Sequence, residues 1–189
     1  MNQTQKISNY MALVKDYSKV LDLTSPKMLM DFPIGIERSL PIAHAIPPKA
    51  RVLDLGSGAG LPAIPTAIWR EDITITLCEI RQKRAAFLER AVSLLELPHA
   101  TVFQGDVRRL QQHFNVVTAL WVGSLSQIYE LVSARLEPNW SIISRKGSEL
   151  EKEVKLLHQI NPNIEIETQQ LEDGATLVIL RGGHQWQLK

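Results

Sequence analysis

From residue 51 onward, the chain alternates short apolar runs with segments of helix length. The apolar runs cover residues 51–55, 73–79, 100–104, 116–121, 140–146, 164–170 and 176–181. Helices are predicted over residues 61–69, 82–95, 125–136 and 148–160, with a short turn at 107–112. Strands that are separated by helices predict right-handed crossovers and a parallel sheet covered on both faces. The pattern therefore predicts an α/β fold with a doubly wound, seven-stranded sheet.

The last two apolar runs are connected differently from the others. Only Leu171, Glu172, Asp173 and Gly174 separate them, which leaves no room for a crossover helix. Two strands joined by such a short turn form an antiparallel hairpin. The sheet is therefore predicted to be mostly parallel, with an antiparallel C-terminal hairpin.

The first 46 residues have a helical pattern instead. Apolar positions recur at spacings of three and four from about Ile7, and Ser25-Pro26 restarts the chain. A second helix is predicted over residues 27–45, broken or kinked because Pro33 and Pro41 interrupt it. We therefore expect one domain of 189 residues, with an N-terminal helical cap (1–46) on an α/β core (47–189).

Composition narrows the class of protein. The hydrophobic fraction of 44% supports a real core, and the net charge of +1 lacks the basic excess of a general nucleic-acid binder. The single cysteine, Cys78, lies in an apolar run and is expected to be a buried strand residue rather than a nucleophile. The five histidines show no metal-ligand spacing, so no metal is predicted. A polar N-terminus and the lack of a long uncharged apolar run predict a cytoplasmic protein without a membrane segment.

The first strand runs into a glycine turn, residues 54–60, of sequence Asp-Leu-Gly-Ser-Gly-Ala-Gly. Glycines suit a turn in which a ligand approaches the backbone closely, and Pro62 suits the first turn of the next helix. In an open parallel sheet, ligands bind at this end of the strands. A dinucleotide fingerprint would place glycine at position 61, where the chain has Leu61, so a nicotinamide cofactor is disfavoured.

Two carboxylates follow the next two strands. Glu79 closes the second strand, where a carboxylate accepts both hydroxyl protons of a ribose. Asp106 lies beyond the third strand, where it either meets an adenine amino group or caps the following short helix. Together with the glycine turn, this spacing predicts a site for a nucleoside cofactor.

Residues 52–65, which read Val-Leu-Asp-Leu-Gly-Ser-Gly-Ala-Gly-Leu-Pro-Ala-Ile-Pro, resemble the motif of the bacterial RsmG (GidB) family. Further similar stretches follow in the family's order: residues 83–88, 117–119 and 146–151. The resemblance runs from about Tyr17 to Arg181. It implies a Rossmann-like class I methyltransferase fold, S-adenosylmethionine as cofactor, and methylation of guanine at N7 in 16S ribosomal RNA.

The resemblance, with the residues above, gives a set of expected site residues. The cofactor is expected to contact Asp54, Gly56, Ser57, Gly58, Gly60, Leu61, Glu79, Asp106, Val107 and Ala119. The expected partner is ribosomal RNA or the small ribosomal subunit, and a monomer is favoured. Methylation of a ring nitrogen with a free lone pair needs no base, so alignment of donor and acceptor supplies most of the catalysis.

The substrate half departs from the family pattern. Leu120 stands where the family has an arginine, and the family's motifs are altered at residues 22–24, 34–40 and 175–176. Arg145 and Lys146, at the end of the fifth strand, are the predicted catalytic cations that replace the arginine. Trp121 is able to stack on a base, but burial against the sheet is the favoured prediction. The alternatives are a methyltransferase for a small molecule or protein, and a non-catalytic relative that binds cofactor or RNA.

Overall fold

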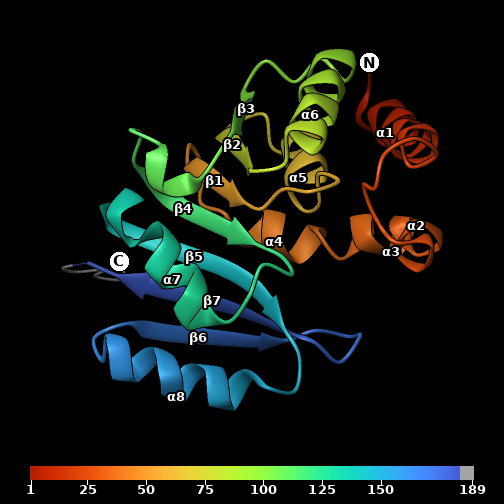
Figure 1. The fold of residues 1–189 in the computed structure, drawn as a ribbon. Helices are drawn as coiled ribbons and strands as arrows, with labels where there is room; N and C mark the ends of the chain where they lie inside the picture. Colours follow the sequence, from red (N-terminus) through yellow and green to blue (C-terminus); the bar gives the residue numbers. More distant parts are fainter. Residues whose placement is uncertain (184–189) are drawn as a thin grey trace.

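The computed structural model describes residues 1–183, and within them seven strands form one sheet (Figure 1). Its order is β3-β2-β1-β4-β5-β7-β6. The strands are β1 (Arg51–Leu55), β2 (Thr74–Glu79), β3 (Ala100–Gln104), β4 (Phe114–Ala119), β5 (Leu136–Lys146), β6 (Glu165–Gln170) and β7 (Thr176–Gly182). The first five strands pair in parallel, and β7 pairs antiparallel with both β5 and β6. The doubly wound sheet and its C-terminal hairpin are confirmed.

Helices cover both faces of the sheet, because consecutive strand residues point to opposite sides. Val52 belongs to a core with α5 (Ala63–Trp69) and α6 (Gln82–Leu94), whereas Leu53 belongs to a second core with α7 (Leu125–Val132) and α8 (Leu150–Ile160). Figure 1 shows these two helix pairs on opposite sides of the sheet. Consecutive buried apolar residues, such as Val52 and Leu53 in β1, are the sequence signature of a sheet buried on both faces.

The N-terminal cap consists of four helices: α1 (Gln3–Tyr17), α2 (Pro26–Met30), α3 (Phe32–Glu37) and α4 (Leu40–Ala45). The predicted start of the first helix near Ile7 is wrong, because Asn2 accepts a hydrogen bond from the Gln5 amide and caps the helix four residues earlier. The second helix predicted over residues 27–45 is divided into three short helices, α2, α3 and α4. A proline stands in the first turn of each, where its missing N–H needs no partner.

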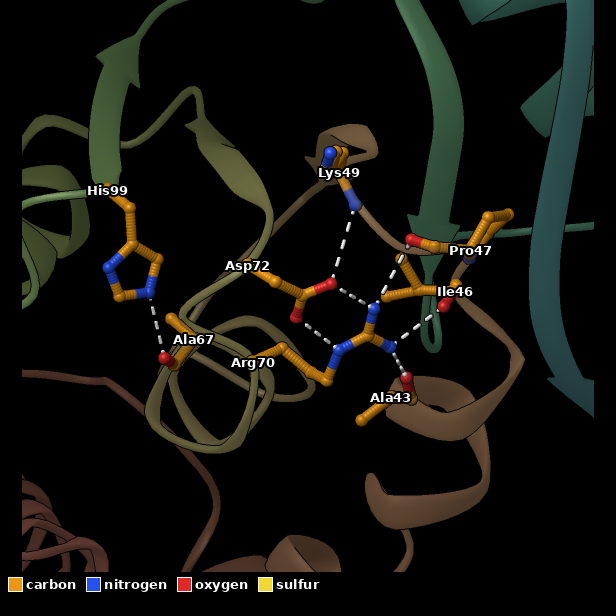
Figure 2. A network of polar contacts seen from close by, with 8 residues as sticks. All are labelled: Ala43, Ile46, Pro47, Lys49, Ala67, Arg70, Asp72 and His99. Carbon is orange, nitrogen blue, oxygen red and sulfur yellow. Dashed lines mark hydrogen bonds and ion pairs between the residues drawn. The ribbon is translucent and has the colours of Figure 1, made fainter.

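Arg70 ties the cap to the core (Figure 2). It follows α5 and donates hydrogen bonds of 2.7 Å to the carbonyls of Ala43 and Ile46, which end α4, and one of 3.2 Å to that of Pro47. Its Nε also pairs with Asp72 at 2.7 Å, and this hydrogen bond lowers the pKa of Asp72 to about 2. The contacts lie at the amino ends of β1 and β2, opposite the glycine turn. They satisfy helix carbonyls that would otherwise lack donors.

Two predicted boundaries near the fourth and fifth strands are wrong. The strand predicted over residues 116–121 is β4, which ends at Ala119, so Leu120 and Trp121 lie in a loop. The helix predicted over residues 125–136 ends at Val132, because residues 133–135 form the 3-10 helix η2 (Ser133–Arg135) and Leu136 already begins β5.

None of the helices within the described residues is long and apolar enough to cross a bilayer.

Candidate functional site

The carboxyl ends of the five parallel strands meet at one edge of the sheet, and the glycine turn lies at its centre. The amides of Gly56 and Ser57 donate to the carbonyl of Cys78 at 2.9 and 3.1 Å. The amide of Gly58 donates to Glu79 Oε2 at 2.9 Å. The turn that follows β1 is therefore held against the end of β2 by three backbone donors.

Gly60 and Gly58 show why the turn needs glycine. Gly60 has a φ of +102°, and a Cβ there would lie 2.7 Å from Ile64 Cγ1 and 2.8 Å from the Tyr10 hydroxyl. That hydroxyl donates to the carbonyl of Ala59 at 2.8 Å, so helix α1 of the cap supports the turn directly. Gly58 has a φ of +54°, but a Cβ there would have its nearest neighbour at 3.7 Å. A side chain at Gly58 would extend into the open space beside the turn.

Two cavities flank the turn and share Gly56. The first, which we call the loop-cap cavity, has a volume of about 230 Å³ and lies between the turn and the cap. The second, the loop-β2 cavity, has a volume of about 300 Å³. The loop-cap cavity is lined by Leu23, Thr24, Ser25, Met28, Phe32, Gly56, Ser57, Gly58, Ala59, Leu61, Arg84, Leu120 and Trp121. The loop-β2 cavity is lined by Leu55, Gly56, Cys78, Glu79, Ile80, Gly105, Asp106, Val107, Arg108, Val122 and Leu131.

Glu79 is 5% exposed and forms one wall of the loop-β2 cavity. Its Oε2 accepts from Gly58 and its Oε1 accepts from the amide of Arg81 at 2.8 Å. A carboxylate oxygen has two acceptor sites, so each oxygen keeps one for a ligand. The same carboxylate thus fixes the turn and remains available to hydroxyl donors.

Asp106 also lines the loop-β2 cavity and caps the 3-10 helix η1 (Val107–Arg109) by accepting from the Arg108 amide at 2.9 Å. Its hydrogen bond with the Arg108 side chain holds the pKa of Asp106 at about 2. The capping role is present, and the adenine contact stays a prediction.

Cys78 is buried as expected. Desolvation raises the pKa of its thiol to about 12, so it is not a thiolate at neutral pH.

Three expected cofactor residues do not line either cavity: Asp54, Gly60 and Ala119. Asp54 is buried behind the turn, where its Oδ1 accepts from Thr118 Oγ1 at 2.7 Å and its Oδ2 has no partner. Desolvation raises the pKa of Asp54 to about 7, although hydrogen bonding opposes the shift. An unpaired buried carboxylate oxygen is costly unless a donor or a cation compensates it.

Several cavity residues were not predicted. Ile80 is 65% exposed and lines the loop-β2 cavity, and its position directly after the strand-end Glu79 is the signal in the sequence that would have found it. Arg84 donates to the carbonyl of Asp22 at 2.8 and 3.0 Å, which joins α6 to the cap. Trp121 is 58% exposed, so its predicted burial is wrong. Leu120, by contrast, is 5% exposed and packs into the core.

The two predicted cations are each engaged by a carboxylate. Arg145, whose side chain is 10% exposed, pairs with Asp173 of the β6–β7 turn, which Arg38 of the cap also contacts at 2.8 Å. Lys146 Nζ pairs with Glu153 of α8 at 2.8 Å and donates to the carbonyl of Gly123. Both residues lie at the strand edge, as expected, but neither lines the two cavities. Their contact with an acceptor stays a prediction.

The family model for GidB, described as rRNA small subunit methyltransferase G, matches residues 3–178. The chain belongs to the GidB family. Among curated GidB proteins, ribosomal RNA small subunit methyltransferase G of Streptomyces avermitilis is 38% identical over 117 residues, which are 60% of this chain and 49% of that protein. The Chlorobium phaeobacteroides protein of the same name is 32% identical over 161 residues, or 82% of this chain and 72% of its own. The match thus spans about half of some GidB relatives and almost three quarters of others.

Solved structures of methyltransferases share the Rossmann-like fold. A methyltransferase from Pyrococcus furiosus superimposes with a TM-score of 0.65 at 14% identity, covering 93% of this chain and 98% of its own. M. jannaschii TYW2, solved in complex with AdoMet, gives a TM-score of 0.58 at 15% identity over 78% of this chain and 74% of that one. These likenesses confirm the predicted class I methyltransferase fold.

Proposed function

We propose that the chain is an S-adenosylmethionine-dependent methyltransferase that modifies ribosomal RNA. The observation that carries the proposal is the pair of cavities that meet at Gly56, with the Gly58–Glu79 hydrogen bond between them. An elongated ligand with a nucleoside at one end and an amino acid at the other fits such a divided site. The proposal accords with membership of the GidB family, which is described as rRNA small subunit methyltransferase G.

The loop-β2 cavity suits the adenosine end. Glu79 has a free acceptor site on each oxygen for the ribose hydroxyls, and the cavity walls beside it include the apolar side chains of Ile80 and Val107. Asp106 lies in the same cavity, in reach of an amino donor on the base. Apolar walls with a few placed polar groups are typical of a site for a small ligand such as a purine nucleoside.

The loop-cap cavity suits the methionine end. Gly56, Ser57, Gly58 and Leu61 line it, and the absence of a side chain at Gly58 keeps the backbone accessible. Asp54 lies behind the turn with one oxygen unpaired. Gly60 belongs to the same turn, and Ala119 ends β4 beside Leu55 of β1. Because the ligand carries positive charge, it favours the ionised form of the buried Asp54 carboxyl.

When bound, S-adenosylmethionine supplies an electrophilic methyl group. Guanine N7, the acceptor we propose in 16S RNA, has a lone pair and no hydrogen, so the protein needs no general base. What the chain contributes is position: the glycine turn and Glu79 fix the donor, and the cap and the β4–α7 loop form the approach for the acceptor. We propose a cytoplasmic location for this activity, because the proposed substrate is RNA of the small ribosomal subunit.

Calorimetry with S-adenosylmethionine, S-adenosylhomocysteine and NAD tests the cofactor assignment. We expect both sulfur ligands to bind and NAD to bind far more weakly. Glu79→Gln should weaken binding by about 1.5 to 3 kcal/mol, because it removes a charged acceptor. Gly58→Leu should abolish binding, because the side chain fills the loop-cap cavity. Leu156→Ala, at an exposed position of α8, is the matched control and should bind like the parent. Preferential binding of NAD, or unchanged affinity in folded Glu79→Gln, would contradict the assignment.

A further inference from the structure

Trp121 is a large aromatic side chain that the fold holds in solvent. It is 58% exposed and lies two residues after β4, at the strand edge where the two cavities lie. Its φ is +59°, a conformation that is rare for bulky residues and costs about 1–3 kcal/mol. The strain and the exposure both oppose a packing role, so the position needs another explanation.

The Trp121 side chain borders two spaces. It lines the loop-cap cavity, and it lines a third space of about 180 Å³, which we call the cap cavity. The cap cavity is lined by Met28, Asp31, Phe32, Gly35, Arg38, Leu61 and Trp121. Met28, Phe32 and Leu61 line both spaces, so the two are neighbours with apolar walls in common. Trp121 therefore lies beside the proposed methionine end and faces a space under the cap.

The loop that carries Trp121 is fixed on its C-terminal side. Lys146 donates to the carbonyl of Gly123, and Glu153 accepts from the amide of Leu125 at 2.8 Å. Ser124 and Gln127 form a capping box at the start of α7. These bonds fix the backbone from Gly123 onward. The loop can therefore move Trp121 only over a short range.

We propose that Trp121 is the surface on which the acceptor base stacks, and that this base is an unpaired purine. Exposed aromatic rings bind unpaired bases through their faces, which a paired base in a helix does not expose. Arg38, on the wall of the cap cavity, pairs with Asp173 through its Nε, and its terminal guanidinium nitrogens can donate to the edge of the base. The inference deepens the proposed function by assigning its acceptor subsite. Under this proposal the substrate contact is made by Trp121, and its neighbour Leu120 stays in the core.

Fluorescence and binding titrations test the subsite without requiring methyl transfer. The probes are a single-stranded oligoribonucleotide with one guanine among uridines, the same strand with an abasic site at that guanine, and its duplex. Each is titrated in the presence of S-adenosylhomocysteine. We expect the guanine strand to bind the parent best and to quench tryptophan emission. Trp121→Ala should weaken that binding by roughly 5- to 100-fold, with little effect on the abasic strand.

Trp121→Phe keeps a stacking ring, so it should retain most of the affinity but lose the quench. Leu156→Ala is the control and should leave thermal unfolding and S-adenosylhomocysteine calorimetry unchanged. Because Trp121 also lines the loop-cap cavity, each variant is titrated with RNA at a concentration of S-adenosylhomocysteine that saturates that variant. The idea is overturned if Trp121→Ala binds the guanine strand like the parent, if the parent does not distinguish guanine from the abasic site, or if Trp121→Ala weakens binding of the abasic strand as much as binding of the guanine strand. Failure of the proposed function would be seen in a different measurement: the parent would bind neither S-adenosylmethionine nor S-adenosylhomocysteine in calorimetry.

Discussion

Lys146 Nζ lies 2.8 Å from Glu153 Oε2, and the same carboxylate oxygen accepts a hydrogen bond from the backbone of Leu125. Lys146 also donates to the carbonyl of Gly123, so the pair connects β5 and α8 to the loop between β4 and α7. Both side chains are largely buried. The lysine predicted to contact the acceptor is thus placed to act through the loop that carries Trp121.

Lys146→Met should reduce methyl transfer much more than cofactor binding. The substitution keeps an unbranched side chain of similar length but leaves Glu153 and the Gly123 carbonyl without their cation, and breaking a buried pair in this way costs about 3–5 kcal/mol. Transfer assays, calorimetry and thermal unfolding measure the three effects. Lys152→Met, which breaks the exposed pair with Glu149, is the control and should change stability by less than about 1 kcal/mol. If Lys146→Met transferred methyl groups as fast as the parent, Lys146 would have no role in positioning the loop for transfer.

Tyr10→Phe should weaken cofactor binding from outside the cavities. The hydroxyl of the buried Tyr10 donates to the Ala59 carbonyl at 2.8 Å, and its loss leaves that acceptor unpaired and frees the glycine turn. We expect the free energy of unfolding to fall by about 1–2 kcal/mol and the affinity for S-adenosylmethionine to fall with it. Tyr17→Phe is the control in the same helix, because Tyr17 contacts Phe87 through its ring. Equal effects of the two substitutions would refute a specific role for the Tyr10 hydroxyl.

Local patterns predicted the parts of the site that local chemistry determines. Alternating apolar runs fix the parallel sheet, and the glycine turn and Glu79 follow from backbone geometry and strand ends. Exposure of Trp121 could not be predicted, because it depends on β4 ending at Ala119 and on a left-handed backbone conformation. The partners of Arg145 and Lys146 come from the β6–β7 turn and from α8, and only the packed fold brings them together.

Asp54 should give stability a distinct dependence on pH. Its folded pKa of about 7 lies above the value of about 3.9 in unfolded chains, so the folded state binds more protons between these values. Stability from this group is therefore full below about pH 4 and falls as pH rises through 7. Asp54→Asn retains an acceptor for Thr118 but cannot ionise. It should be more stable than the parent at pH 8, by up to about 4 kcal/mol, and the difference should vanish near pH 4.

Chemical denaturation of both proteins from pH 4 to pH 8 measures this difference. Other groups titrate in both proteins and cancel in the subtraction. S-adenosylmethionine, being cationic, should lower the pKa of Asp54 and release protons on binding to the parent near pH 7. A constant difference in stability across the range would contradict the shifted pKa.

Arg70→Ala should lower stability without touching the site. It removes the donors to the carbonyls of Ala43, Ile46 and Pro47 at the end of α4, and we expect a loss of about 2–4 kcal/mol. A chain of this size should then melt roughly 4–16 °C lower. Arg70→Lys should not restore it, because one ammonium cannot reproduce the guanidinium fork. Arg51→Ala, which breaks an exposed pair with Glu137, is the control. If Arg70→Ala and Arg51→Ala lowered the stability by equally small amounts, the three carbonyls would have found other donors.

Transfer of a labelled methyl group from S-adenosylmethionine to 16S RNA tests the central claim most directly. The substrate is the small ribosomal subunit from a strain lacking the corresponding gene, and the labelled nucleotide is mapped after digestion. We predict label at N7 of a single guanine, at a rate strongly reduced by Glu79→Gln and unaffected by Leu156→Ala. Tight binding of S-adenosylmethionine without any label in the RNA would contradict the account.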